Sequence, residues 1–286
     1  MQIRERLPQY VYLMRLDKPI GVLLLLWPTL WALWLASHGR LDSQILLIFV
    51  TGVVLMRSAG CVVNDFADRH FDGHVKRTRE RPLASGRVKP VEALVLAALL
   101  ALTAFAGVLL CNALTIKLAF IGAALTIIYP LMKRYTHLPQ FGLGLAFSWG
   151  VPMAFAAVTG SVGNAAWFLF LTCLIWPVIY DTMYAMVDRE DDRKIGVKST
   201  AILFDEMDTF IIGLLQMLFV VLLVIMGLMF RLHFIYYLAL AAVGVLFIYQ
   251  QWLIKSRDPQ ACFRAFKNNN WVGLLIFLGI FLSYPQ

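Results

Sequence analysis

The stretch NDFADRHFD (residues 64–72) follows a long apolar run, and its polar spacing recurs further along the chain in YAMVDREDD (residues 184–192). Both stretches place polar side chains at positions i, i+4 and i+8: Asn64, Asp68 and Asp72 in the first, and Tyr184, Asp188 and Asp192 in the second. Residues four apart share one face of a helix, so each stretch predicts a polar helical face. Like charges at this spacing repel, which indicates that cations cover both faces.

The composition indicates an integral membrane protein. Of the 286 residues, 60% are hydrophobic and 15% are charged, whereas globular domains average about 25% charged. The first apolar run is too long for a signal peptide and is expected to stay in the bilayer. Because a spanning helix needs about 20 mostly apolar residues, we expect one all-α domain over residues 1–286 with nine transmembrane helices, at residues 20–36, 45–64, 91–111, 113–132, 141–158, 165–185, 209–230, 234–254 and 271–284.

The basic residues predict the orientation of these spans. With the N-terminus inside, nearly all Lys and Arg residues fall in cytoplasmic segments, and the outside segments hold only Arg40, Lys117 and Arg231. The positive-inside rule therefore predicts N-in/C-out. Both acidic stretches then emerge at the cytoplasmic face, in the long loops 65–90 and 186–208. Four spans separate them, which predicts two similar four-helix halves plus a ninth helix.

Carboxylates that converge at one membrane boundary indicate a divalent cation. Mg²⁺ prefers carboxylate oxygens and usually keeps phosphate oxygens as further ligands, and no Cys or His spacing here is typical of zinc. The acids together with nearby bases therefore predict a Mg²⁺–diphosphate site. The alternative is that each acidic helix end is a solvated face that is locally paired, with Arg69, His70 and Arg189 as available partners.

Several bases could serve such a site. Arg57 lies inside a span, on the same predicted helical face as Asn64, and a charge there needs a ligand or a structural partner such as Asp65. The other candidates lie at predicted cytoplasmic helix ends or in the first long loop, where they could equally be ordinary positive-inside anchors or a mobile loop: Arg15, Lys18, Lys133, Arg134, Lys76, Arg77, Arg79 and Arg81.

At these residues the chain resembles the UbiA superfamily of intramembrane prenyltransferases. The paired signatures NxxxDxxxD and YxxxDxxxD of that superfamily are both present without departure. Further segments are similar to the branch that acts on 4-hydroxybenzoate in ubiquinone synthesis: LDKPIG, LLLLWPTLWALW, MRSAGCVVNDFADRHFDGHVKRTRERPLASG, YPLMKRYTHLPQ, PMAFAAV, YAMVDREDD and IGVKSTAILF. The resemblance covers nearly the whole chain. It implies a nine-helix fold, a polyprenyl diphosphate donor and a 4-hydroxybenzoate acceptor.

The resemblance also implies roles for the residues at the predicted site. Two Mg²⁺ ions would bridge the diphosphate to the Asp residues of both motifs, with Asn64 as a neutral ligand or as a group that orients a carboxylate. Tyr184 would face the allylic cation or orient the diphosphate, and Asp191 is a candidate base for the ring proton. The diphosphate would contact Lys18, Arg57, Arg77 and Lys133, and the acceptor carboxylate would be held by Arg134 or Arg57.

Rival functions remain distinguishable. Asp72-Gly73 faintly resembles the CDP-alcohol phosphatidyltransferase motif, but the upstream acid is four residues away instead of three, and the downstream stretch is basic. A secondary transporter would carry its acids near mid-bilayer, and dihydroxynaphthoate or homogentisate would be alternative acceptors for the same chemistry. The reading that we favour requires small substrates and a lipid bilayer, implies no nucleic acid, specifies no protein partner, and places the protein in a bacterial inner membrane with its active site facing the cytoplasm.

Overall fold

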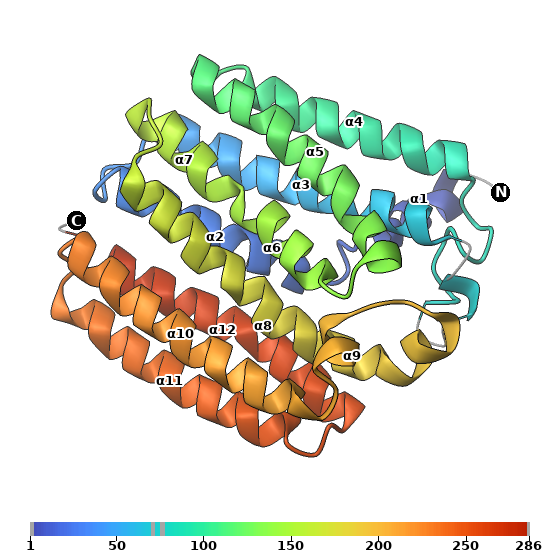
Figure 1. Ribbon diagram of the computed structural model, residues 1–286. Helices are drawn as coiled ribbons and strands as arrows, with labels where there is room; N and C mark the ends of the chain where they lie inside the picture. The colour runs from blue at the N-terminus through green and yellow to red at the C-terminus, as the bar shows by residue number, and fades with distance from the viewer. Residues whose placement is uncertain (1–2, 70–71, 75–77, 285–286) are drawn as a thin grey trace.

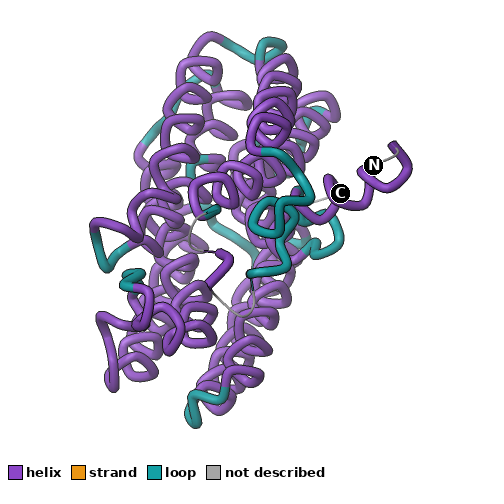
Figure 2. Tube along the Cα trace, turned by 90° about the vertical axis from the view of Figure 1, so that its right-hand side faces the viewer, coloured by secondary structure: helices purple, strands orange, loops and turns teal. Residues whose placement is uncertain are grey.

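A computed structural model describes residues 3–69, 72–74 and 78–284, and this part of the chain contains helices and loops but no β-strand (Figures 1 and 2). The elements in chain order are α1 (Ile3–Leu13), α2 (Ile20–Ala36), α3 (Ser43–Asp68), η1 (Asp72–His74), α4 (Pro90–Val108), α5 (Ala113–Tyr135), α6 (Pro139–Ser148), α7 (Gly150–Thr159), α8 (Asn164–Ile195), α9 (Thr200–Phe204), η2 (Asp205–Met207), α10 (Asp208–Met229), α11 (Phe234–Ile254) and α12 (Pro259–Phe281).

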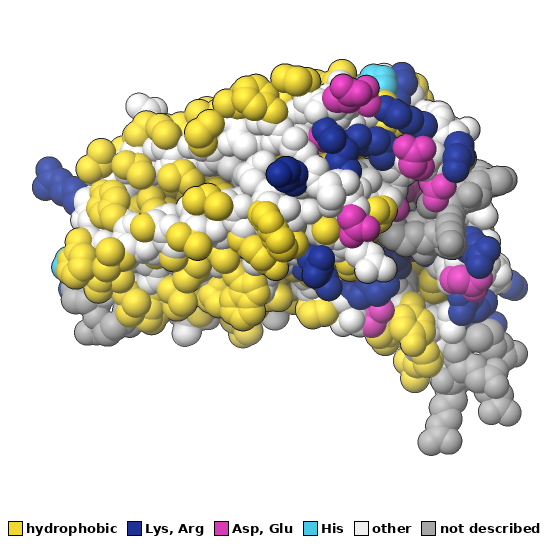
Figure 3. All heavy atoms as spheres, turned by 90° about the horizontal axis from the view of Figure 1, so that it is seen from below, with side chains coloured by type: hydrophobic (Ala, Val, Ile, Leu, Met, Phe, Trp, Pro, Cys, Tyr) yellow, Lys and Arg dark blue, Asp and Glu magenta, His cyan; other side chains and the backbone are white. Residues whose placement is uncertain are grey.

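The long helices run side by side along one axis (Figure 1). By length and composition, seven helical segments in the described part could cross a membrane, and α2 is a further apolar helix of 17 residues. Figure 3 shows hydrophobic side chains over most of the visible face, with charged side chains gathered mainly towards one end. The connections that follow α3 and α8 lie at this same end of the bundle, and the C-terminus lies at the opposite end from the N-terminus (Figure 1).

Capping residues set several helix boundaries. Asp42 accepts hydrogen bonds from the backbone amides of Gln44 and Ile45 at the start of α3, and Asp258 accepts one from Ala261 at the start of α12. Such caps satisfy amides that have no partner within the helix. The α6–α7 break at Trp149 has a different cause, because Pro152 lacks the amide that would bond to the carbonyl of Ser148.

The structure corrects several predicted boundaries. The predicted helix 165–185 extends to Ile195, so Tyr184, Asp188 and Asp192 all lie on α8. The predicted helix 271–284 begins earlier, at Pro259, and therefore includes polar residues. The predicted shared helical face of the first motif is wrong for Asp72, because α3 ends at Asp68 and Asp72 lies on η1. The Thr78 hydroxyl, which donates to the Asp72 carbonyl at 2.8 Å, helps to hold this turn.

Three successive asparagines explain why α12 carries polar residues. Asn268 accepts from Gln250 of α11 at 2.9 Å, Asn269 from the Trp176 indole of α8 at 3.0 Å, and Asn270 from the Trp27 indole of α2 at 2.9 Å. Successive helical positions point about 100° apart, so each amide reaches a different neighbouring helix. Where apolar packing does not discriminate between neighbours, these bonds fix which helices meet α12.

The Asn269–Trp176 bond provides a test of this packing. We expect Asn269→Ala to lower the free energy of unfolding in detergent by about 1–3 kcal/mol, because it leaves a fully buried indole N–H without its acceptor. Arg264→Ala is a matched control on the same helix, where the side chain is exposed. Thermal unfolding of the two purified variants would show the difference; equal stability would mean that the bond does not hold α12 in place.

Candidate active site

The two acidic motifs line one pocket. This acidic pocket has a volume of about 170 Å³ and receives side chains from both long connections and from the ends of α3, α5 and α8. All six motif residues line it: Asn64, Asp68, Asp72, Tyr184, Asp188 and Asp192. Sequences far apart in the chain therefore meet here, as their matched spacing predicts.

Cations lie against the carboxylates of the first motif. Lys133 of α5 forms an ion pair with Asp68, and Arg81 forms one with Asp72 at 2.9 Å. Burial raises the pKa of Asp72 above its ordinary value, and the negative charges of Asp68 and Asp65 raise it further, whereas Arg81 lowers it. At Asp72, therefore, the positive charge of Arg81 offsets part of the cost of burying the carboxylate.

Asp65 links the first motif to the connection between α1 and α2. Its carboxylate is 2% exposed and accepts two hydrogen bonds from Arg15, both at 2.8 Å, and one from Arg81 at 3.0 Å. Arg81 thus bridges Asp65 and Asp72. The residue expected as a structural partner for Arg57 is instead the centre of a different ion-pair network.

The second connection is anchored beside Lys133. The backbone amide of Lys198 donates to the Lys133 carbonyl at 3.0 Å, and the amide of Thr200 donates to the Gln140 side chain at 3.0 Å. Lys198 itself lines the acidic pocket. Arg189, an available local partner for the second motif, pairs instead with the fully buried Asp208, which weighs against a purely local role for the motif.

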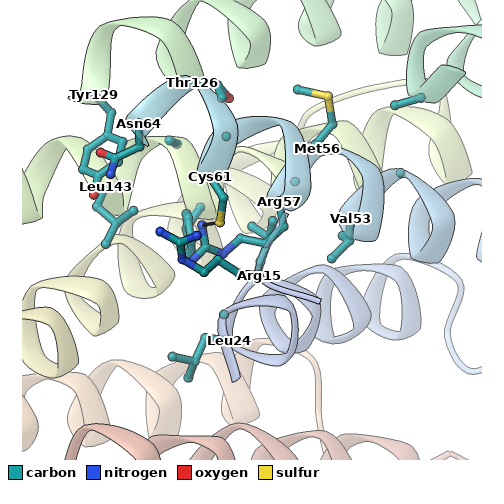
Figure 4. Close-up of a pocket in the computed structure, with 18 of the residues that line it drawn as sticks. Arg15, Leu24, Val53, Met56, Arg57, Cys61, Asn64, Thr126, Tyr129 and Leu143 are labelled. Atoms are coloured by element: carbon teal, nitrogen blue, oxygen red, sulfur yellow. Dashed lines mark hydrogen bonds between the residues drawn. The ribbon is translucent and has the colours of Figure 1, made fainter. Parts of the chain in front are cut away.

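A second, larger space adjoins the acidic pocket. This central cavity has a volume of about 1160 Å³ and is lined by residues of α2 to α8 and by Phe263 and Phe266 of α12. Figure 4 shows some of the lining residues in close-up. Much of its lining is apolar, including Phe49, Phe105 and Phe120. Five residues line both spaces: Asn64, Arg81, Tyr129, Asp181 and Tyr184. A ligand could therefore place a charged end in the acidic pocket and an apolar part in the central cavity.

Arg57 lines the central cavity but not the acidic pocket. It donates to the Cys61 sulfur at 2.8 Å, as Figure 4 shows, and its guanidinium carbon lies 5.6 Å from the centre of the Phe147 ring. Within the described ranges Arg57 forms no ion pair, and its buried Nε has no hydrogen-bond partner. A guanidinium in such surroundings favours an anionic ligand.

The remaining predicted residues differ in where they lie. Lys18 lines the central cavity, whereas Lys133 lines the acidic pocket. Arg134 is exposed, donates to the carbonyl of Ala67 and lines neither space. Asp191 also lines neither space and pairs with Lys194 at 3.7 Å, with 40% of its side chain exposed. Arg77 lies outside the described residues.

Sequence reasoning missed several residues at the junction. Asp181 and Tyr129 line both spaces, and Lys198 lines the acidic pocket. The available signals were an acid within the apolar stretch IWPVIYDTMY (residues 175–184) and the position of Lys198 in IGVKST (residues 195–200). Asp181 and Lys198 belong to no repeated spacing, so the sequence pattern did not mark them as site residues.

Comparisons with known proteins agree with this architecture. Residues 25–281 match the model of the UbiA prenyltransferase family, and the chain belongs to that family. A 4-hydroxybenzoate octaprenyltransferase from Alkalilimnicola ehrlichii is 58% identical over 281 residues, which cover 98% of this chain and 96% of the relative.

Two archaeal structures share the fold. A UbiA homolog from Aeropyrum pernix superposes with a TM-score of 0.80 at 24% identity, covering 92% of this chain and 97% of the other. A homolog from Archaeoglobus fulgidus, solved with GPP and Mg²⁺, gives 0.72 at 16% identity, with 96% and 99% covered. At these identities the likeness concerns the fold alone.

The acidic pocket has the donor chemistry for Mg²⁺. Its acids supply hard oxygen ligands, and the Oδ1 atom of Asp68 is buried without a hydrogen-bond partner among the residues that the structure describes. In that same part of the chain, no three His, Cys, Asp or Glu side chains form a ready-made metal cluster. Mg²⁺ usually takes only one or two carboxylates together with substrate phosphates, so the residues fit a metal that binds with a phosphate-bearing substrate.

The Asp65 network provides a second test. Asp65→Asn keeps the size of the side chain but removes the charge that Arg15 and Arg81 share, so we expect a loss of about 3 kcal/mol in the free energy of unfolding. It should also speed proteolytic cleavage between α1 and α2. Asp17→Asn is a suitable control because Asp17 is an exposed acid of the same connection; equal cleavage rates in the two variants would contradict the proposed link.

Proposed function

We propose that this membrane protein transfers a polyprenyl group from a polyprenyl diphosphate to the ring carbon ortho to the hydroxyl of 4-hydroxybenzoate, a step of ubiquinone synthesis. The name of the Alkalilimnicola ehrlichii relative gives the same acceptor and an octaprenyl donor. The supporting observation in the structure is the junction between the two spaces, where five residues face both an acidic pocket and a large apolar cavity.

The donor would span this junction. Its prenyl tail would occupy the apolar part of the central cavity, since each CH₂ group that leaves water contributes about 0.8 kcal/mol. Its diphosphate would lie in the acidic pocket with two Mg²⁺ ions held by Asp68, Asp72, Asp188 and Asp192, and with Asn64 as a neutral ligand or orienting group. When bound there, Mg²⁺ would neutralise the diphosphate and make it a better leaving group. The archaeal homolog solved with GPP and Mg²⁺ supports this choice of metal.

Basic residues would stabilise the departing diphosphate. Lys133, Arg81 and Lys198 line the acidic pocket and would donate hydrogen bonds to phosphate oxygens. As the allylic C–O bond breaks, the electron pair leaves with the diphosphate, so these contacts strengthen towards the transition state. We propose supporting contacts from Lys18, at the edge of the central cavity, and from Arg77 of the first connection.

The allylic cation and the aromatic ring would meet at the junction. The Tyr184 ring lies 4.8 Å from that of Phe266, and Tyr184 lines both spaces, so its π-face could stabilise the cation while its hydroxyl is an alternative contact for diphosphate. The new carbon–carbon bond forms at the ring carbon, which then loses its proton. We propose Asp181 as the proton acceptor in place of Asp191, because Asp181 faces the junction and Asp191 pairs with Lys194.

We assign the acceptor carboxylate to Arg57. It does not line the acidic pocket and forms no ion pair in the described part of the chain, although the charge of Asp181 acts on it, whereas Lys133 and Arg81 are paired with carboxylates. Arg134 is exposed and outside both spaces, which makes it the weaker of the two predicted candidates.

For the membrane, we propose nine spans with the N-terminus in the cytoplasm, in which α2 and α12 join the seven apolar segments. Three observations support this arrangement. α2 is apolar although short, hydrogen bonds join α12 to α2 and α8, and both acidic motifs lie at the charged end of the bundle. The acidic pocket would then face the cytoplasm at a bacterial inner membrane, and the two four-helix halves with a ninth helix remain part of this proposal.

The metal assignment is tested by removing single charges. Asp72→Asn and Asp192→Asn should each lower turnover at least about 100-fold, because the diphosphate loses metal-borne charge stabilisation. Product formation from purified protein, octaprenyl diphosphate and 4-hydroxybenzoate is the measurement, with EDTA giving a comparable loss. Asp205→Asn, outside both spaces, is the control. Wild-type turnover of either motif variant at limiting Mg²⁺ would contradict the assignment, and absence of product with the unaltered protein would favour a transporter.

Acceptor recognition is tested by comparing the two arginines. We expect Arg57→Gln to raise the KM for 4-hydroxybenzoate at least about tenfold, because a charge-assisted hydrogen bond is lost, while the KM for the donor changes little. Arg134→Gln should leave the acceptor KM near the wild-type value. The opposite ranking would move the carboxylate to Arg134. Competition with dihydroxynaphthoate and homogentisate under the same conditions would establish which acceptor is preferred.

A further inference from the structure

Gly21 lies directly against the guanidinium of Arg57. A Cβ atom at position 21 would sit 2.5 Å from Nη2, 2.6 Å from Nε and 2.9 Å from Cζ of Arg57. Real Cβ atoms essentially never come within 3.0 Å of another heavy atom, so any side chain at this position would force the guanidinium to move. Both residues line the central cavity, Gly21 from the first turn of α2 and Arg57 from α3.

The backbone conformation does not explain why residue 21 is a glycine. Gly21 lies within α2 and its φ is not in the positive range that favours glycine. Glycine inside a helix is less stable than alanine, so the helix alone would gain from a methyl group here. The close approach of Arg57 is the feature of the structure that a methyl group at this position would disturb, because the guanidinium would have to move to admit it.

The Arg57 side chain makes two further contacts. Its Nη1 donates to Cys61 at 2.8 Å (Figure 4), and the Phe147 ring lies 5.6 Å from its Cζ. These contacts come from a thiol and a ring, and none supplies a negative charge. The guanidinium therefore lies in the central cavity with its Nε still without a hydrogen-bond partner in the described chain.

We infer that Gly21 is a specificity-determining residue. Because it has no side chain, the Arg57 guanidinium can lie directly against its backbone. In this position the guanidinium binds the carboxylate of an aromatic acid and so selects the acceptor. The inference rests on the proposed function and adds the residue that positions its carboxylate-binding arginine. A methyl group at position 21 would displace the guanidinium and break its contact with Cys61. The donor would be less affected, because its diphosphate is held in the acidic pocket, to which neither Gly21 nor Arg57 contributes.

The experiment is steady-state kinetics of Gly21→Ala with octaprenyl diphosphate and 4-hydroxybenzoate. We expect the acceptor KM to rise about tenfold, as for the partial loss of a charge-assisted hydrogen bond, with the donor KM and kcat within about twofold of wild type. Gly244→Ala is the control, since Gly244 is a helical glycine outside the cavity with no atom within 4 Å of the added Cβ; its acceptor KM should not change.

A double-mutant cycle shows whether Gly21 acts through Arg57. In an Arg57→Gln background the guanidinium is gone, so adding Gly21→Ala should change the acceptor KM less than about twofold. If Gly21→Ala raised the acceptor KM equally in both backgrounds, or left it unchanged in the wild-type background, the inference would be overturned. A general loss of folding would lower kcat for both substrates in either background and would count against it. Failure of the proposed function is a separate result, because the unaltered protein would then form no prenylated product.

Discussion

Repulsion between two sets of carboxylates, brought together at one end of an apolar bundle, is the constraint on which the rest of this structure depends. Asp68, Asp72, Asp188 and Asp192 face one small pocket, and like charges so placed are unfavourable unless cations accompany them. The chain supplies Lys133 and Arg81, and the first acidic motif is thereby compatible with a folded protein. In the proposed function, the same charges would hold a metal-bound diphosphate, so the carboxylates that are costly to bury would also serve the chemistry.

Several polar groups elsewhere in the bundle are paired with partners within the protein. Asn268, Asn269 and Asn270 each meet a partner on a different helix, and Asp208 is fully buried yet paired with Arg189 and Arg257. A polar group with a full set of partners stabilises one packing of the helices. Such a group has no hydrogen-bonding capacity left for a ligand. In this respect these structural groups differ from those that line the two spaces.

Much of this organisation could be predicted from the sequence. Apolar runs of helix length mark most of the long helices, and the shared spacing of the two motifs predicted that they would converge. Asp72 could not be placed, because Thr78 and Arg81 hold it on a separate turn. The sequence also could not show which of two neighbouring bases contacts the acids. Lys133 and Arg134 point in directions about 100° apart, and the packing of α5 against α3 decides which of them lies near the first motif. Asp181 belongs to no repeat, and the contact between Gly21 and Arg57 joins two helices whose relative rotation no periodicity reveals.

Arg57 shows why the two spaces need different cations. Lys133 and Arg81 of the acidic pocket are paired with the protein's own acids, so in the proposed function they would bind phosphate where a metal takes over those carboxylates. Arg57 faces a thiol, a ring and a glycine backbone in the described structure, and burying a guanidinium among such groups costs free energy that an anion recovers on binding. A neutral phenol would leave that cost in place, whereas an aromatic acid removes it. In the proposed function the central cavity would therefore select a charged acceptor although much of its lining is apolar, because a buried guanidinium without an ion pair in the described chain discriminates between ligands more strongly than the apolar walls around it.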